Sequence, residues 1–233
     1  MTRLRIASYN IHQCVGGDGR RSAERVAAVL REIDADVVGL QEVDARSGAT
    51  SDSMQMDYLA SRLGLQAFAG PTILRHDGHY GNALLTRVPV RDLRHLELTV
   101  HRREPRAMMD ADLDAGGRPV RLIATHLGLL PGERRKQVRR MLERLGPGDG
   151  TPTILFGDIN EWFGVGRPLR WLNRRLGACS RVSTFPATFP IFALDRVWVT
   201  PPGKLARVTA HASATARVAS DHLPLVADVE LGS

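Results

Sequence analysis

The stretch "TILFGDINEW", residues 153–162, combines an apolar run with an abrupt change to polar residues. Residues 153–156 form the short apolar run that is typical of a fully buried strand. Asp158 and Asn160 follow this run almost at once. A carboxylate and a carboxamide at the end of a buried strand are held rigidly, so the stretch predicts a β-strand that delivers two polar groups for a chemical purpose.

The same arrangement recurs where other predicted strands meet the surface. The residues concerned are all acidic, carboxamide or imidazole side chains: Asn10, Glu42, His126, Asp195, Asp221 and His222. Taken singly, a strand-end Asp or Asn is usually a turn former. If the strands lie side by side, however, their ends converge and these side chains form one cluster.

The chemistry of such a cluster can be specified. Carboxylate and carboxamide oxygens suit Mg²⁺ or Mn²⁺, and carboxylates packed together without a cation would repel one another. The two histidines do not belong to a zinc-finger or H-E-x-x-H pattern, so they suit proton transfer and contact with an anion better than structural zinc binding.

Hydrophobic periodicity predicts the remaining organisation. Segments that read as strands are 4–12, 36–44, 82–87, 90–100, 107–114, 119–127, 153–157, 194–199 and 223–231. Segments that read as helices are one capped by Ser22, then 53–63 closed by Gly64, 132–145 and 166–175. Hairpins interspersed with helices indicate an α/β protein with a pair of mixed sheets covered by helices. No linker separates two parts, so a single domain over residues 1–233 is expected.

Composition sets further bounds. The 233 residues are 43% hydrophobic and 24% charged, as in ordinary globular proteins, and no segment has the length of a signal peptide or a membrane span. A cytoplasmic monomer without a transmembrane segment is therefore expected. Cys14 and Cys179 are too few for a disulfide framework and are expected to be small buried apolar residues.

The net charge of +7 has two explanations. It can serve an anionic partner such as nucleic acid, an anionic lipid head group or a phosphorylated small molecule. Lys136 and Lys204 are the only lysines, so the excess is arginine and can equally reflect the nucleotide composition of the gene. The basic side chains of the 132–145 helix read either as a solvated face, which is favoured, or as a binding patch; they are Arg134, Arg135, Lys136, Arg139 and Arg140.

Seven short blocks carry a family resemblance. In chain order they are SYNIH, LQEVD, GNALLTR, ATHLG, GDINEW, ALDRVWV and SDHLPL. Together they resemble the endonuclease/exonuclease/phosphatase superfamily, from residue 4 to residue 231. The resemblance implies a four-layer α/β sandwich, in which two mixed β-sheets face each other and are flanked by helices.

The resemblance also implies roles for individual residues. Glu42 resembles the principal metal ligand, with Asn10 beside it and Asp221 as a further ligand. Asp158 and Asn160 resemble the pair that orients the attacking water and contacts the phosphate.

A second group of positions is matched to catalysis and to substrate phosphate. His222 resembles the general base or electrostatic partner, and Asp195 the carboxylate that fixes its tautomer. His126 resembles a second histidine that touches the scissile phosphate. The remaining phosphate contacts are Tyr80 and an arginine, for which the chain offers Arg106, the favoured one, and Arg103.

The predicted function is hydrolysis of phosphodiester bonds with Mg²⁺ or Mn²⁺, foremost in nucleic acid by an endo- or exonuclease. A phospholipid head group or a small phosphorylated metabolite is the alternative substrate, since the chain is compact and only 5% aromatic. An inactive anion-binding pseudoenzyme is a remote alternative. The segment "TFPATFP" (184–190) reads either as packed core, which is favoured, or as a rim that grips a base or a lipid chain.

Overall fold

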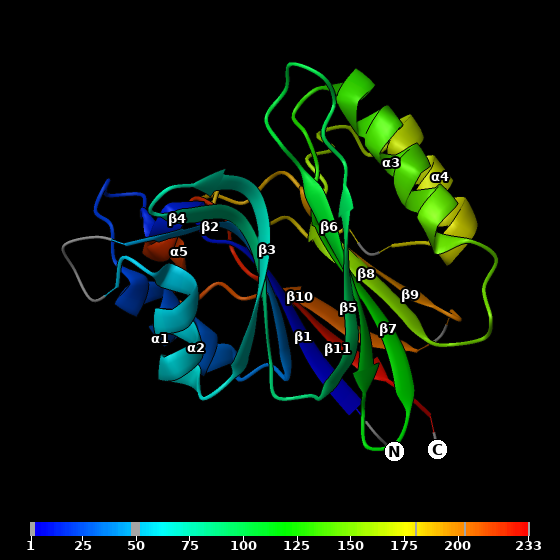
Figure 1. Cartoon of the computed structure of the whole chain (residues 1–233), viewed down its shortest axis with the longest axis horizontal. Helices are drawn as coiled ribbons and strands as arrows, with labels where there is room; N and C mark the ends of the chain where they lie inside the picture. Colours follow the sequence, from blue (N-terminus) through cyan, green and yellow to red (C-terminus); the bar gives the residue numbers. More distant parts are fainter. Residues whose placement is uncertain (1–2, 48–51, 180, 203, 233) are drawn as a thin grey trace.

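The computed structural model describes residues 3–47, 52–179, 181–202 and 204–232. Within them the strands form a six-stranded sheet in the order β10-β11-β1-β2-β4-β3 and a five-stranded sheet in the order β5-β6-β7-β8-β9 (Figure 1). No helix of these residues is long and apolar enough to cross a membrane.

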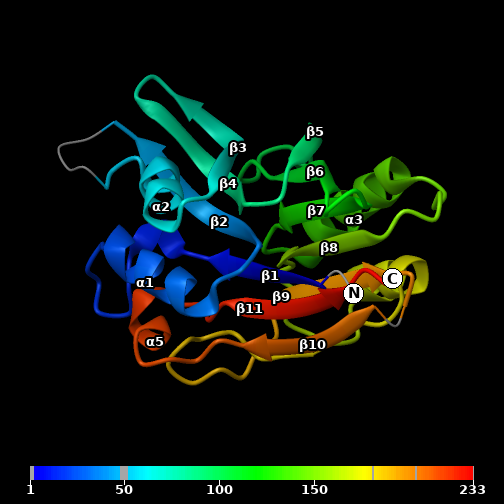
Figure 2. The same ribbon diagram turned by 90° about the horizontal axis from the view of Figure 1, so that it is seen from below.

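The six-stranded sheet is mixed. Its strands are β1 (Arg3–Asn10), β2 (Val37–Arg46), β3 (Gln66–Arg75), β4 (Gly78–Thr86), β10 (Leu205–Ala210) and β11 (Leu225–Glu230). Strands β1 and β2 are parallel and the other neighbours are antiparallel. The helices on its outer side are α1 (Ala23–Ile33), α2 (Gln55–Leu63) and the short α5 (Ala216–Ala219), and a 3-10 turn, η1 (His12–Cys14), follows β1 (Figure 2).

The five-stranded sheet is also mixed. Its strands are β5 (Val90–Glu97), β6 (Ala107–Asp114), β7 (Pro119–His126), β8 (Thr153–Asp158) and β9 (Asp195–Thr200). Only β7 and β8 are parallel. Helices α3 (Pro131–Leu145) and α4 (Arg167–Leu176) cover its outer face (Figure 1).

Three apolar clusters fill the spaces between four layers. One lies between α1, α2 and the first sheet, one between the two sheets, and one between the second sheet and α3 with α4. Strand β8 shows how alternation divides the clusters, because Ile154 and Phe156 face the other sheet whereas Leu155 faces the helices. The predicted α/β four-layer sandwich with two mixed sheets is confirmed.

The inter-sheet packing depends on one glycine. A Cβ atom on Gly39 of β2 would lie 2.3 Å from the ring of Phe156, a separation that real contacts do not show. The absence of a side chain at position 39 therefore lets the largest apolar residue of β8 reach across between the sheets.

Local signals in the sequence account for the helix ends. The Ser22 hydroxyl accepts a hydrogen bond from the Arg25 amide at 3.3 Å, which caps α1 as predicted. Gly64 closes α2 in the left-handed conformation, with φ of 64°. Cys14 is buried as predicted, but Cys179 is only half-buried.

Two strands were not predicted, and one was predicted too long. Strand β3 contains Gly70 and Pro71 in its interior, which read as a turn, and β10 is a half-exposed edge strand without clear alternation. Strand β5 ends at Glu97 rather than at residue 100.

Candidate active site

Three predicted site residues lie side by side across the second sheet. His126 at the end of β7 is the register partner of Asp158 at the end of β8, and Asp158 is the register partner of Asp195 at the start of β9. All three side chains are buried. The alignment of strand ends thus brings together residues that are up to 69 positions apart in the chain, as the sequence predicts.

Gly157 makes this alignment possible. Its φ is 145°, a conformation that residues with side chains rarely adopt, and a Cβ atom there would lie 1.9 Å from the carbonyl oxygen of Thr125 on β7. The backbones of β7 and β8 can therefore approach only if residue 157 is a glycine, which places Asp158 beside His126.

The first sheet contributes Asn10 and Glu42. Asn10 ends β1 and is buried. Glu42 does not end its strand as predicted: β2 continues to Arg46, and the pairing of β2 with β4 shifts register between Leu40 and Val43. Glu42 occupies this bulge with φ of 56°, and the irregular backbone turns its carboxylate toward Asn10.

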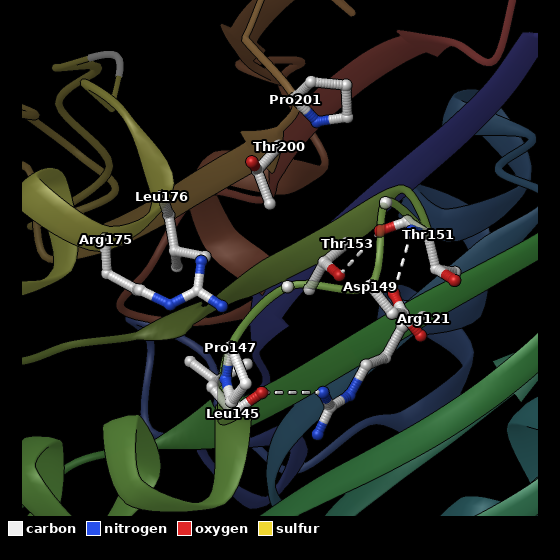
Figure 3. Close-up of a pocket in the computed structure, with 12 residues that line it drawn as sticks. Arg121, Leu145, Pro147, Asp149, Thr151, Thr153, Arg175, Leu176, Thr200 and Pro201 are labelled. Atoms are coloured by element: carbon white, nitrogen blue, oxygen red, sulfur yellow. Dashed lines mark hydrogen bonds between the residues drawn. The ribbon is translucent and has the colours of Figure 1, made fainter.

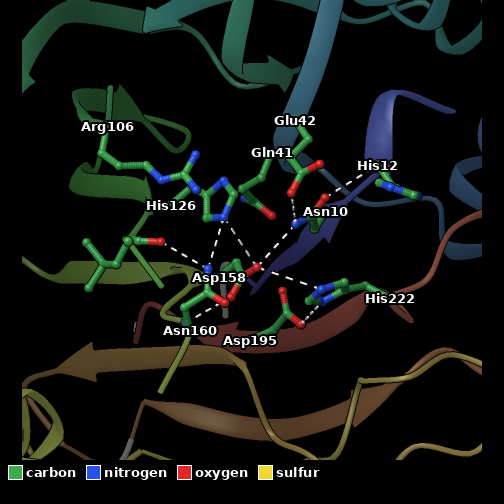
Figure 4. Close-up of polar contacts among 12 residues, drawn as sticks. Asn10, His12, Gln41, Glu42, Arg106, His126, Asp158, Asn160, Asp195 and His222 are labelled. Carbon is green, nitrogen blue, oxygen red and sulfur yellow. Dashed lines mark hydrogen bonds and ion pairs between the residues drawn. The ribbon is translucent and has the colours of Figure 1, made fainter. Parts of the chain in front are cut away.

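Asp195 and His222 form the predicted pair (Figure 4). The Nδ1 atom of His222 lies 2.9 Å from Oδ2 of Asp195, which also accepts a hydrogen bond from the Thr184 hydroxyl at 2.6 Å. Burial alone would lower the pKa of His222, but the adjacent carboxylates, Asp195 first, outweigh it and raise this pKa to about 10. The imidazole is therefore held in one orientation and in its protonated form.

Asp158 lies at the centre of the cluster. Its Oδ2 atom is 3.8 Å from Nε2 of His222, 3.6 Å from Nε2 of His126 and 3.2 Å from the amide nitrogen of Asn10 (Figure 4). Burial, and to a smaller extent the charge of Asp195, raise the pKa of Asp158 to about 6 in spite of His222 and Asn10. A carboxyl group in this position titrates close to neutral pH.

His126 and Asn160 are in direct contact. The Asn160 amide nitrogen lies 3.1 Å from Nε2 of His126 and donates a hydrogen bond to the Leu127 carbonyl at 3.0 Å. Burial lowers the pKa of His126 well below its usual value, and the charges of Arg106 and His222 lower it further. His126 is therefore neutral, unlike His222 on the other side of Asp158.

The two candidate arginines lie in different surroundings. Arg106 is buried, and its guanidinium binds the carboxylate of Glu104 at 2.8 and 3.1 Å while it points toward His126 (Figure 4). Arg103 is exposed in the loop between β5 and β6. Tyr80 on β4 is buried, and desolvation with the nearby Glu42 charge raises the pKa of its hydroxyl.

Asn10 and Glu42, which lie beside Asp158, offer the donor types that a divalent cation of the Mg²⁺ class prefers. One oxygen of Glu42 and one of Asp158 converge on the Asn10 amide nitrogen, at 3.0 and 3.2 Å. No three His, Cys, Asp or Glu side chains of the described residues form a closed metal-binding cluster. Mg²⁺ commonly binds through one or two carboxylates and keeps several waters, so an open donor set of this kind fits it.

Asp221 lies at the margin of this set. Its carboxylate is 41% exposed and 4.0 Å from Nδ1 of His12. His12 was not among the predicted site residues, although the SYNIH block contains it. Its backbone amide donates a hydrogen bond to the Asn10 side-chain oxygen at 3.1 Å, and its φ of 46° is left-handed.

Two hydroxyl residues that position the site were also missed. Thr184 fixes Asp195, as described above, and the buried Ser220 donates a hydrogen bond to the Asn10 carbonyl at 2.7 Å. Ser220 stands directly before Asp221 and His222 and could have been found from the SDH block. Thr184 precedes Asp195 by 11 positions, and no sequence signal connects the two.

Comparison with known proteins identifies the family of the chain. The sequence profile described as the Endonuclease/Exonuclease/phosphatase family matches residues 7–222. The chain belongs to this family. It is 28% identical to uncharacterized protein YbhP of Escherichia coli strain K12 over 247 aligned positions, which cover 98% of this chain and 96% of YbhP.

Solved structures of the family share the fold. An endonuclease/exonuclease/phosphatase from Beutenbergia cavernae DSM 12333 has a TM-score of 0.79 and 24% identity, covering 100% of this chain and 72% of its own. A mannosyl-6-phosphatase of Bacteroides thetaiotaomicron VPI-5482 has a TM-score of 0.76 and 18% identity, covering 96% of this chain and 98% of its own. At these identities the likeness concerns the fold and not the substrate.

A separate cavity of about 170 Å³ lies at the opposite end of the second sheet (Figure 3). It is lined by residues at the start of β8 and the end of β9, together with Arg121 and Arg175. Both arginines already bind carbonyl oxygens, of Leu145 at 3.2 Å and Gly146 at 2.7 Å respectively. Because the cavity lies at the start of β8 and the end of β9, it is remote from the opposite strand ends, which carry His126, Asp158 and Asp195.

Proposed function

We propose that this chain hydrolyses phosphodiester bonds with the help of a divalent cation, Mg²⁺ or Mn²⁺. The observation that supports this proposal most strongly is the position of Asp158. It lies between a protonated His222 and a neutral His126, and the amide of Asn10 connects it to Glu42. A buried carboxylate that lies between an imidazolium and hydrogen-bond donors is well placed to orient a water molecule for attack on phosphorus.

The residues of the chain would divide the reaction as follows. Asp158 orients the attacking water and accepts its proton, for which a pKa of about 6 is well matched. His222, kept protonated by Asp195, stabilises negative charge on the pentavalent phosphorus. Asn160 and the neutral His126 contact nonbridging oxygens from the side of the second sheet.

The cation would be held by Glu42 and Asn10, with Asp221 as a further ligand. When bound, it would neutralise charge on a phosphate oxygen and on the leaving oxygen. Tyr80 and Arg106 are proposed as additional phosphate contacts. Arg106 is favoured over Arg103, because its buried guanidinium points toward the cluster whereas Arg103 is exposed in a loop.

Nucleic acid remains the first predicted substrate. Part of the arginine excess that led to this prediction, however, has another role. Three buried carboxylates each engage two or three arginines: Asp44 with Arg21, Arg46 and Arg75, Asp110 with Arg94, Arg121 and Arg144, and Asp228 with Arg3 and Arg5. These arginines stabilise the fold. A phospholipid head group is the second candidate, which the exposed apolar side chains described in the next subsection favour.

A panel assay tests the proposal. Plasmid DNA, RNA, phospholipids and bis-p-nitrophenyl phosphate are incubated with Mg²⁺ or Mn²⁺, for the wild-type protein and for His222→Ala. We expect hydrolysis of at least one phosphodiester that depends on the cation and on His222. Binding of every substrate without turnover would instead identify an anion-binding pseudoenzyme.

The salt dependence of binding distinguishes the candidate substrates. If duplex DNA is the substrate, its affinity should fall by about one logarithmic unit per phosphate contact for each decade of salt. A flat dependence would exclude nucleic acid. We also propose that the whole chain is one catalytic domain, since both sheets contribute to the site, and that it acts as a cytoplasmic monomer.

A further inference from the structure

Exposed apolar side chains gather beside the catalytic strand ends. Among the residues that the structure describes, nine large apolar side chains are exposed, and seven of them lie in three loops of the second sheet. These seven residues, called the apolar rim below, are Leu129, Leu130, Trp162, Phe163, Val165, Phe189 and Ile191. The loops follow β7 and β8 and precede β9, so each adjoins a strand end that carries His126, Asp158 or Asp195.

The rim is strongly exposed, and within residues 184–190 Phe189 corrects the interpretation as packed core, which holds for the buried Thr184. Phe163, Val165 and Phe189 are 71%, 80% and 74% exposed. Ala187, by contrast, is buried in the first core cluster. A soluble surface rarely collects apolar side chains in one place unless they meet a partner.

The three loops of the rim are fastened to one another. Arg134 of α3 is buried, contrary to the expected solvated face, and its guanidinium lies 3.3 Å from both oxygens of Glu161. It also donates hydrogen bonds to the carbonyls of Gly128 and Leu129, at 3.2 and 2.5 Å. The loop after β7 is therefore tied to the loop after β8.

Aromatic contacts join the second and third loops and reach the catalytic histidine. The ring of Trp162 lies 5.7 Å from that of Phe185 and 4.9 Å from that of Phe192. The Phe185 ring lies 4.9 Å from the imidazole of His222. These contacts hold the three loops of the rim together, and the rim borders the candidate active site.

Basic side chains flank the rim. A groove of about 710 Å³ between α3 and the loop that joins β5 to β6 is lined by Arg103, Arg135, Lys136, Arg139 and Arg167, and Leu130 of the rim lines it as well. Arg135 and Lys136 form no ion pair with a described residue. This groove, called the basic groove below, places positive charge next to the protruding apolar side chains.

We propose that the apolar rim and the basic groove together dock the protein on an anionic phospholipid bilayer. Trp and Phe side chains partition into the interface between head groups and acyl chains, and neighbouring Arg and Lys side chains are attracted by anionic head groups. Four of the seven rim residues are aliphatic and offer no ring on which a nucleobase could stack. Charge complementarity suits any anionic partner, and the aliphatic content of the rim favours a bilayer over a nucleic acid.

Docking would present a lipid phosphodiester to the site. The rim lies around His126, Asp158 and Asp195, so a lipid head group at the bilayer surface would face these residues. This consequence rests on the proposed function, whereas docking itself needs no turnover. Binding is therefore measured in chelator, where a failure to dock and a failure to hydrolyse are separate results.

The experiment compares binding to vesicles of phosphatidylcholine alone with binding to vesicles that contain about 30% phosphatidylglycerol. Flotation with the anionic vesicles should recover the wild-type protein. The double substitution Phe163→Ser with Val165→Ser should weaken this binding by about tenfold or more. Arg135→Gln and Lys136→Gln should each weaken it by roughly fivefold, on anionic vesicles only.

Matched controls are available outside the apolar rim and the basic groove. Leu74 on β3 is 78% exposed, and Leu74→Ser should leave vesicle binding unchanged. Arg207→Gln on β10 is the corresponding control for charge. Should the rim variant unfold, Phe189→Ser with Ile191→Ser replaces it, and quenching of wild-type tryptophan fluorescence by brominated lipid reports docking without any substitution.

Three results would overturn the proposal. One is equal binding of wild-type protein and rim variants to anionic vesicles, or no binding at all. Another is a loss of affinity for a single-stranded oligonucleotide in the rim variants without loss of vesicle binding, which would identify a nucleic acid surface. The third is a dimer in sedimentation that disappears in the rim variants, since the rim would then join two copies of this chain.

Discussion

Asp195 and His222 meet at 2.9 Å although 27 positions separate them in the chain and they adjoin different sheets. Asp195 starts β9 of the second sheet, whereas His222 stands in the loop before β11 of the first. The pair is buried, and the Thr184 hydroxyl donates a hydrogen bond to the same oxygen of Asp195. An ionised carboxylate in this position requires the imidazolium as its partner.

Asp195→Asn and His222→Ala should each lower turnover by about two or more orders of magnitude, the scale of a lost acid–base or electrostatic group. The double variant should lose little more than the worse single variant, because the two residues act as a unit. Steady-state kinetics on the best substrate of the panel measure both effects. His211→Ala is the control: His211 also contacts a carboxylate, that of Glu32 at 2.6 Å, but lies outside the site. Independent, multiplicative losses in the two single variants would contradict the pairing.

Glu42→Gln should abolish cation-dependent hydrolysis and leave the fold intact, because it removes a charge from a half-buried carboxylate without changing its shape. Affinity for Mn²⁺, measured by calorimetry, should fall by about tenfold or more. EDTA should stop the wild-type enzyme, and Mg²⁺ or Mn²⁺ should restore it. Glu230→Gln, at the exposed end of β11, should change neither quantity. Full activity of the wild type in chelator would exclude the metal mechanism.

Gly157→Ala should destabilise the protein by about 3 kcal/mol or more, since the added methyl group would overlap the Thr125 carbonyl and the positive φ would be strained. Urea unfolding gives the change in free energy, and turnover should fall with it because Asp158 follows directly. Gly148→Ala is the matched control, with only the Arg175 guanidinium near the new methyl group at 3.6 Å. Equal stability of the two variants would mean that β7 and β8 do not require the close approach.

The ion pairs of Asp110 should make the free energy of unfolding decrease at acidic pH. Burial alone would raise the pKa of Asp110, but its ion pairs with Arg121 and Arg94 outweigh burial and lower this pKa. A carboxyl group with a depressed folded-state pKa stabilises the protein above its unfolded-state pKa, about 3.9, and the contribution is lost as the pH falls below that value.

Asp110→Asn should accordingly cost about 3 kcal/mol of unfolding free energy at pH 7, the scale of breaking a buried ion pair. The difference from wild type should shrink as the pH falls below about 4, because Asp110 of the unfolded wild-type chain binds a proton there, and it should vanish below the lower pKa of the folded state. Urea unfolding of both proteins across this pH range measures it. A difference that is constant with pH would show that the cost comes from packing and not from charge.

Much of the site could be predicted because strand ends are visible in a sequence. The apolar run before Asp158 and the one before His126 each mark a buried strand, and parallel neighbours place their ends together. The bulge at Glu42 could not be predicted, since it depends on the pairing of β2 with β4. Likewise, Arg134 reads as part of an exposed helix face until the fold brings Glu161 to it from 27 positions away.

The fold shows the same limit. Alternating or continuous apolar patterns revealed the central strands, whereas β3 was hidden by Gly70 and Pro71 in its interior. The edge strand β10 lacks a buried face with a clear period, so only its hydrogen bonds to β11 define it. The exposure of Phe189 in the apolar rim could not be predicted, because the loops around it decide whether its side chain is buried or exposed.

The division of the site between the two sheets has a consequence for inactivation. Asn10 and Glu42 belong to the first sheet, and Asp158 and Asp195 to the second, while apolar side chains pack between the two sheets in the middle layer. A small shear between the sheets would separate Asn10 from Asp158 before any strand lost its ladder of backbone hydrogen bonds. Catalysis would thus fail on heating at a lower temperature than the far-ultraviolet circular dichroism of the sheets, and activity would report the mutual alignment of two otherwise intact halves.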